Sequence, residues 1–178
     1  MIIYNINIRM VETYKKIVGF ENYSVSDHGN ARNDTTGRIL KAINHERGYW
    51  QVGLRKNNKP HIKKIHKLVT AAFLLNPEKK NCVDHIDNNK HNNNLINLRF
   101  ATSQQNNQNR SINNNNTSGT KGVGWNKKSM KWTARIKING KSIHLGSFIN
   151  KEDAINIRIQ RAKNEFGEFI NKCELVIN

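Results

Sequence analysis

The strongest constraint on the fold is an amphipathic pattern in residues 131–166. Apolar side chains alternate with polar ones in a first segment, as in a half-buried strand: Trp132, Ala134, Ile136 and Ile138. Asn139-Gly140 follows, which favours a tight hairpin turn, and Lys141–Phe148 alternates again. A helical spacing comes next in residues 151–166, with apolar positions at Ile155, Ile159, Ala162 and Phe166. We therefore expect a small sheet with one face covered by a helix.

The opposite face of this predicted sheet is polar and basic. Residues 119–150 contain seven Lys and Arg residues and no acidic residue. A small sheet of this kind fits the major groove of B-DNA. We therefore predict contacts with phosphates and base edges by a set that comprises Lys121, Trp125, Lys127, Lys131, Arg135, Lys137 and His144. For Trp125, packing inside the domain is an alternative of equal weight.

Net charge supports a polyanionic partner for the whole chain. The 178 residues carry a formal charge of +17, divided as +8 over residues 1–75, +2 over 76–118 and +7 over 119–178. Such a chain repels itself unless it meets a polyanion. Residues 47–77 form a second acid-free window, where we predict DNA contacts by Lys63, Lys64 and Lys67. A solvated basic face without a ligand is the alternative. The longest apolar run, Leu68–Leu75, is too short to cross a membrane.

The N-terminal stretch is typical of short strands joined by turns. Tyr23–Ser26 leads into the turn Asp27-His28-Gly29-Asn30, and Arg38–Lys41 forms a further candidate strand. Tyr49–Leu54 and residues 60–65 predict a hairpin, followed by a short helix over residues 67–75.

The middle stretch has little net charge but carries the chemistry. Cys82–His85 predicts the end of a strand, and Asn97–Ala101 predicts a second strand beyond a polar loop. Thr102 and Gln105 match a capping box, which places Asn106 about one turn into a helix. The second half of residues 104–118 is rich in asparagine and indicates a linker.

These residues resemble the signature of the H-N-H nucleases, whose fold is the ββα-metal finger. Asp84-His85 falls on its first histidine, and Asn97, in Asn97-Leu98-Arg99-Phe100, falls on its middle asparagine. The last position, often histidine, is Asn106 here, a variant that resembles phage intron-encoded homing endonucleases.

The flanking segments carry two further resemblances. Residues 19–30 look like a module found upstream of such nucleases, with Tyr14 where tryptophan is common. Residues 118–123, 131–136 and 145–148 resemble the APETALA2-type DNA-binding domain of plant ethylene-response factors. Together the resemblances cover roughly residues 12–171.

The resemblance implies a chemistry that suits the residue types. Histidine can take a proton near neutral pH, so His85 is the expected general base. Asp84 and Asn106 offer oxygen ligands for one divalent cation, Mg²⁺ or Mn²⁺. Asn97 is expected to hold the loop and to orient His85, and Arg99 to contact DNA.

We therefore expect an α+β chain of small modules. These are an N-terminal antiparallel β module in residues 1–75, a ββα-metal finger in 76–112, a linker in 113–118 and a three-stranded sheet packed by one helix in 119–178. The expected function is a metal-dependent homing endonuclease acting on double-stranded DNA, with a monomer expected and a dimer as the alternative. Removal of residues 119–178 is expected to flatten the salt dependence of DNA binding and to leave the residues of the cutting centre in place.

Two other functions stay open at this point. One is a sequence-specific DNA-binding or regulatory protein with a degenerate finger, and the weaker one is a membrane-surface or RNA-binding protein. Met1–Asn7 lacks the features of a signal peptide, and Cys82 and Cys173 form no CxxC pair, so we expect a reducing host-cell interior. A phage or viral origin is expected.

Overall fold

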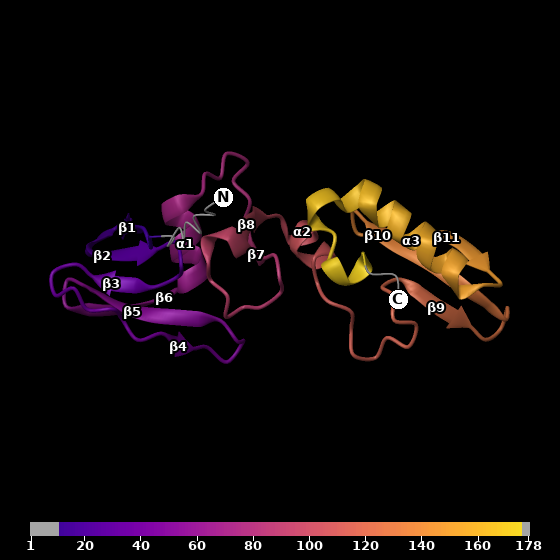
Figure 1. The fold of residues 1–178 in the computed structure, drawn as a ribbon, viewed down its shortest axis with the longest axis horizontal. Helices are drawn as coiled ribbons and strands as arrows, with labels where there is room; N and C mark the ends of the chain where they lie inside the picture. The colour runs from indigo at the N-terminus through magenta and orange to yellow at the C-terminus, as the bar shows by residue number, and fades with distance from the viewer. Residues whose placement is uncertain (1–10, 176–178) are drawn as a thin grey trace, which may run out of the picture. The chain divides into compact units, whose positions relative to one another are not determined.

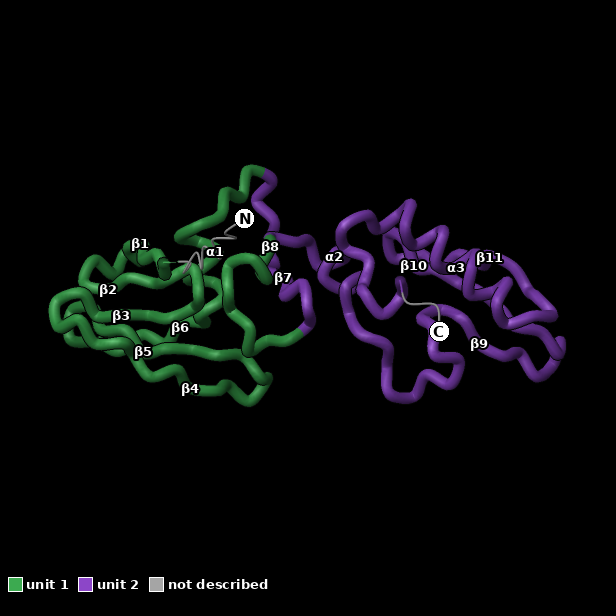
Figure 2. The backbone as a smooth tube through the Cα atoms, in the orientation of Figure 1, with its two compact units in different colours: residues 1–77, 89–99 green, residues 78–88, 100–178 purple. Residues whose placement is uncertain are grey.

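The computed structural model describes residues 11–175, so the prediction made for Met1–Asn7 lies outside the described residues. The fold class is α+β, as predicted, with three antiparallel three-stranded sheets and one two-stranded sheet in the described part. The chain divides into two compact units, coloured in Figure 2. Unit 1 contains residues 11–77 and 89–99, and unit 2 contains residues 78–88 and 100–175. Within residues 11–175, no helix has the length and apolarity needed to span a membrane.

Unit 1 is built on two sheets and one helix. The first sheet contains β1 (Tyr14–Ile17), β2 (Phe20–Ser26) and β3 (Ala31–Asn33), and the second contains β4 (Ile43–Asn44), β5 (Trp50–Lys56) and β6 (Lys59–Lys64). Helix α1 (Ile65–Phe73) packs against β1, β2, β5 and β6. The core forms where apolar residues of these elements meet, including Val25, Val52, Leu54 and Val69.

The predicted β5–β6 hairpin is confirmed, and its turn residues Asn57 and Asn58 have φ values of 51° and 58°. Two local expectations differ from the structure. The predicted strand Arg38–Lys41 is reduced to one isolated bridge between Ile39 and Arg32. The helix begins at Ile65, two residues earlier than predicted, because Ile65 and His66 are buried with it.

The polar loop that follows β7 (Cys82–His85) belongs to unit 1 from residue 89 onward. Leu95 N donates to Asp27 O at 2.7 Å, which ties the loop to the β2–β3 turn. Gly29 in that turn has φ +88°, and a Cβ placed there would lie 2.9 Å from Asn93 Cβ. The turn therefore sets the path of residues 89–97, which end in the short 3₁₀ helix η1 (Leu95–Asn97).

Unit 2 contains the remaining strands and helices. These are β7, β8 (Leu98–Ala101), α2 (Ser103–Gln108), β9 (Val123–Asn126), β10 (Lys131–Ile138), β11 (Lys141–Phe148), α3 (Lys151–Phe166) and the 3₁₀ helices η2 (Gly167–Phe169) and η3 (Lys172–Glu174). Leu98 and Arg99, the first residues of β8, count with unit 1. Helix α3 lies along one face of the β9–β11 sheet, as predicted (Figure 1). Its apolar residues bury Ala134 and Ile136 of β10.

A β-bulge in β11 shapes the other face of this sheet. Ala134 pairs with Gly146 and Arg135 pairs with His144, so Leu145 is the extra residue. Leu145 turns to the α3 side and packs on both buried clusters there. Gly146 has φ +148°, and a Cβ there would lie 2.6 Å from the Phe148 ring. Glycine is therefore required at the bulge.

A buried carboxylate joins three segments of unit 2. Glu174 is 1% exposed, and its oxygens lie 2.7 Å from Lys121 Nζ and 2.8 Å from an Arg158 guanidinium nitrogen. These contacts are ion pairs. Burial lowers the pKa of Arg158 from its ordinary value, and the Glu174 carboxylate opposes that shift. Glu174 thus links η3 to α3 and to the segment before β9.

Substitution of Gly29 by alanine tests the contact between the turn and the loop. Gly29→Ala should destabilise the protein by about 1–3 kcal/mol, because it adds backbone strain and a clash with Asn93. Gly37→Ala is the matched control, since Gly37 also has a positive φ (+71°) but nothing within 4 Å of its Cβ position. Thermal unfolding of the two variants measures the difference, and equal losses would contradict the contact.

Substitution of Glu174 by glutamine tests the buried charge. Glu174→Gln should destabilise unit 2 by about 3 kcal/mol, because the buried Arg158 and the half-buried Lys121 lose their counter-charge. Glu165→Gln is the control, since it breaks an exposed pair with Arg161 at the same 2.8 Å separation and should cost about 0.5 kcal/mol or less. Urea unfolding provides the comparison. A similar midpoint for both variants would show that the buried pair adds nothing.

Candidate active site

Two adjacent polar residues end strand β7. Asp84 and His85 are 3% and 5% exposed, and the chain turns directly after them, with Asn88 N donating to His85 O at 2.9 Å. β7 pairs with β8 in the two-stranded sheet. The predicted strand, loop and second strand are therefore present.

Helix α2 packs against β7 and carries Asn106. The predicted capping box is formed: Thr102 Oγ1 accepts from Gln105 N at 3.2 Å, and Gln105 Oε1 accepts from Thr102 N at 2.8 Å. The cap satisfies N–H groups at the start of a helix that has no apolar face. It fixes the start of α2 and places the half-buried Asn106 in the helix's first turns.

Asn109, directly after α2, is the buried polar residue that the sequence analysis missed. It is 1% exposed, and its Nδ2 lies 3.0 Å and 3.1 Å from the two carboxylate oxygens of Asp84. The same nitrogen lies 2.9 Å from His85 O and 3.3 Å from Ile86 O. A signal was available, because Asn109 is three residues after Asn106 and therefore lies on the same side of the chain.

Asn171, at the start of η3, holds Asn109 in turn. Asn171 Nδ2 donates to the backbone oxygen of Asn109 and to its Oδ1, the second contact at 3.2 Å. Asn171 Oδ1 accepts from Cys173 N at 2.9 Å and caps η3. Both asparagines are buried, so this amide pair lies inside unit 2.

The structure places Asn97 in unit 1, at the end of η1. Its Nδ2 donates to Asn92 O across the loop at 2.8 Å. His91 in the same loop is exposed and stacks on Trp50, with 5.0 Å between ring centroids. Of the four predicted centre residues, Asp84, His85 and Asn106 thus belong to unit 2.

The oxygen donors present suit a hard cation that keeps several waters. Among residues 11–175, no group of three or more His, Cys, Asp or Glu side chains is placed to hold a metal ion. Mg²⁺ is commonly bound through one or two protein oxygens, substrate phosphate and water. The Asp84 carboxylate offers oxygen ligands of the kind that such an ion prefers, and Asn106 offers an amide oxygen on the helix packed against β7. The residues therefore fit a hydrated magnesium or manganese ion.

The open face of the β9–β11 sheet is basic, as predicted. Arg135 and Lys137 are exposed on the side away from α3, and Lys127 and Lys131 are exposed at the neighbouring strand ends. Because of the bulge, His144 and Ser147 share this face, with 3.4 Å between His144 Nε2 and Ser147 Oγ.

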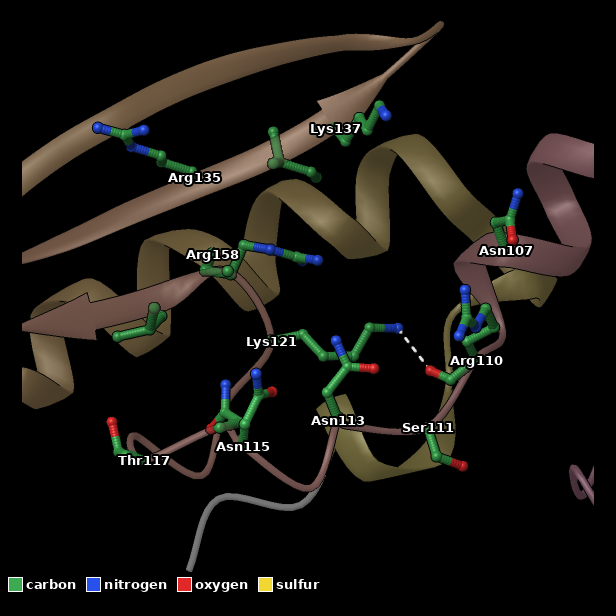
Figure 3. Close-up of a pocket in the computed structure, with 14 residues that line it drawn as sticks. Asn107, Arg110, Ser111, Asn113, Asn115, Thr117, Lys121, Arg135, Lys137 and Arg158 are labelled. Carbon is green, nitrogen blue, oxygen red and sulfur yellow. Dashed lines mark hydrogen bonds between the residues drawn. The ribbon is translucent and has the colours of Figure 1, made fainter.

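Two predicted DNA contacts lie elsewhere. Lys121 Nζ donates to Gln108 O at 2.7 Å and to Arg110 O at 2.8 Å, in addition to its ion pair with Glu174. Its ammonium group is therefore occupied inside unit 2, beside a cavity of about 580 Å³ (Figure 3). Trp125 pairs with Trp132, and this register places it at the edge of the α3 side, where it is 41% exposed.

The basic residues of unit 1 differ in exposure. Lys63 and Lys67 are exposed, whereas Lys64 and Arg99 are half-buried. Lys63 Nζ lies 5.5 Å from the centre of the Phe20 ring, and Lys64 Nζ lies 4.7 Å from that of Tyr49. Both ammonium groups are thus supported by aromatic rings.

Two family models match the chain. Residues 12–55 match the NUMOD4 motif, and residues 64–108 match an HNH endonuclease family. These ranges contain most of unit 1 and the four predicted centre residues.

Relatives of the chain come from viruses and phages. The uncharacterised HNH endonuclease L245 of Acanthamoeba polyphaga mimivirus is 37% identical over 147 residues, which cover 83% of this chain and 39% of that protein. The DNA endonuclease I-HmuI of Bacillus phage SP01 is 37% identical over 97 residues, which cover 54% of this chain and 56% of that protein. The chain thus spans less than two thirds of these curated relatives.

A solved structure extends the similarity over more of the chain. The HNH homing endonuclease I-HmuI, whose structure is described as showing DNA binding and cleavage, matches with a TM-score of 0.53 and 26% identity. The match covers 87% of this chain and 83% of that chain. This protein therefore contains an HNH endonuclease domain preceded by a NUMOD4 motif, and it is similar in sequence and fold to a phage homing endonuclease.

Proposed function

We propose that the protein is a metal-dependent DNA endonuclease of the homing type. The observation that carries the proposal is the placement of Asp84 and His85 at the end of β7, against the helix that carries Asn106. These three residues lie in the segment that matches the HNH endonuclease family. The similarity to I-HmuI supports double-stranded DNA as the substrate.

Each residue of the centre has a role that its chemistry allows. His85 takes a proton from the attacking water, and the turn after β7 lets Asp84 and His85 serve one phosphate although neighbours in a regular strand point apart. Asp84 and Asn106 hold the cation through oxygen atoms. Once bound, the cation supplies Lewis-acid stabilisation of the phosphate and of the leaving 3′ oxygen. Asn97 holds the loop through Asn92 and orients His85.

The basic surfaces of the two units bind the DNA. The open face of the β9–β11 sheet, in a domain of the APETALA2 type, contacts phosphates and base edges along the groove through Arg135, Lys137 and His144. Lys127 and Lys131 contact phosphates beside it, and Lys63, Lys64, Lys67 and Arg99 do so from unit 1. The proposed module boundaries lie at residues 75, 112 and 118. The proposed active form is a monomer, and the proposed origin of the gene is a phage or virus.

A nicking assay tests the cutting function. Supercoiled plasmids carrying segments of the source organism's DNA should be nicked with Mg²⁺ or Mn²⁺ and should stay intact in EDTA. His85→Ala should lower the rate at least about 100-fold, because the attacking water loses its base. His45→Ala, in the β4–β5 turn, is the matched histidine control. Full activity of His85→Ala would refute the assigned base.

The same plasmids distinguish the proposed endonuclease from the alternative function. A DNA-binding or regulatory protein with a degenerate finger would retain these plasmids in a filter-binding assay without nicking them under any metal condition. That outcome would replace the endonuclease proposal.

A salt titration tests the DNA-binding face. The double variant Arg135→Gln/Lys137→Gln should reduce the slope of log affinity against log salt by about 2, because each phosphate contact contributes about 0.9 to 1. The control Arg161→Gln/Lys163→Gln changes the charge equally at exposed positions of α3. Fluorescence anisotropy in EDTA gives both slopes. Equal slopes in the two double variants would exclude this face as the contact.

A further inference from the structure

We propose that Asn109 is a positioning residue of the cutting centre, and that Asn171 holds it from the C-terminal segment. The inference rests on the proposed function, because it concerns how Asp84 is held for its cation. It adds two residues outside the predicted set and connects the centre to a segment more than sixty positions later in the chain.

The first step is the environment of the Asn109 amide nitrogen. It faces four oxygens at 2.9–3.3 Å: both carboxylate oxygens of Asp84 and the backbone oxygens of His85 and Ile86. Such a set of acceptors favours an N–H donor at this position. The amide therefore restrains the plane of the Asp84 carboxylate.

The second step is the orientation of the Asn109 amide itself. Its Oδ1 accepts from Asn171 Nδ2 at 3.2 Å and from Asn88 Nδ2 at 3.4 Å, which keeps Nδ2 directed at Asp84. Asn171 also donates to the Asn109 backbone oxygen. Asn171 thus fixes both the backbone and the side chain of Asn109.

The third step is the support around this pair. Lys121 donates to the backbone oxygens of Gln108 and Arg110, the two neighbours of Asn109. Lys121 is held in turn by Glu174, three residues after Asn171. Two separate contacts from η3 therefore converge on residues 108–110. By this inference, removal of residues 119–178 would keep the residues of the cutting centre in the chain but would take away the contacts of Asn171 and Glu174 that support residues 108–110.

The test uses the full chain and Mn²⁺ alone as the probe. Asn109→Ala removes the donor, and Asn171→Ser keeps a hydroxyl to cap η3 but lacks the amide donor. Asn107→Ala is the matched control, because Asn107 lies in α2, two residues before Asn109, and is exposed. Calorimetric Mn²⁺ titration without DNA measures binding independently of activity, and circular dichroism and DNA affinity in EDTA report the fold.

Mn²⁺ binding should weaken about tenfold in Asn109→Ala, as is usual when a group that orients a metal ligand is lost. Asn171→Ser should weaken it about threefold, and the double variant should match Asn109→Ala, because Asn171 acts through Asn109. Saturating Mn²⁺ should restore most of the nicking rate in both single variants. A loss of general structure would instead lower the rate at every metal concentration.

The outcomes separate this inference from the function on which it rests. Wild-type protein that binds Mn²⁺ and nicks DNA, with unchanged Mn²⁺ affinity in folded Asn109→Ala, overturns the positioning role alone. If Asn109→Ala does not fold, unchanged affinity in Asn171→Ser overturns it. Wild-type protein that neither binds Mn²⁺ nor nicks its DNA overturns the proposed function and the inference together.

Discussion

The Asp84 carboxylate is buried, and a buried carboxylate is tolerated only where donors or opposite charges surround it. Asn109 supplies a donor from the residue directly after α2, and Asn171 fixes that donor from η3. The capping box at the other end of α2 sets where the helix begins and therefore where Asn106 lies. In the proposed centre, the orientation of Asp84 thus depends on the Asn109 amide and on the contacts that keep this amide in place.

The charge that the protein presents at its surface depends on which charged side chains are buried as well as on the sequence. The chain has 30 Lys and Arg residues against 13 Asp and Glu, and several of its acids serve internal contacts. Glu174 forms ion pairs with Lys121 and Arg158, and Asp34 accepts hydrogen bonds from Lys16, Ser24 and Arg32. For Asp34, burial alone would raise the pKa, but these hydrogen bonds and the Lys16 charge outweigh it, so the pKa is lowered. The basic residues proposed to contact DNA, such as Arg135 and Lys137, remain exposed at the surface.

Local patterns predicted much of the fold, because hairpins, caps and amphipathic helices are determined by residues close in sequence. The β10–β11 hairpin, α3 and the α2 capping box are examples. Contacts between distant residues could not be predicted in this way. The charge of Lys121 alone predicted a phosphate contact, but in the structure its ammonium group pairs with Glu174. The sequence leaves two roles open for Trp125, and the register with Trp132 decides between them. Asn109 carries only a weak sequence signal, its spacing of three residues from Asn106, because it lies in an asparagine-rich stretch.

The amide pair between Asn109 and Asn171 also limits how such proteins can be recombined. Under the proposed function, exchange of the C-terminal sheet for another DNA-binding domain is a route to a new target site. A chimaera joined in the asparagine-rich segment at residues 113–118 would lose Asn171 and Glu174 together with the old specificity. A working junction would have to retain residues 171–174, or the incoming domain would have to bring an amide donor and a carboxylate of its own. In the proposed function, target recognition and cutting thus use different residues, but both depend on the C-terminal segment, which contains Asn171 and Glu174.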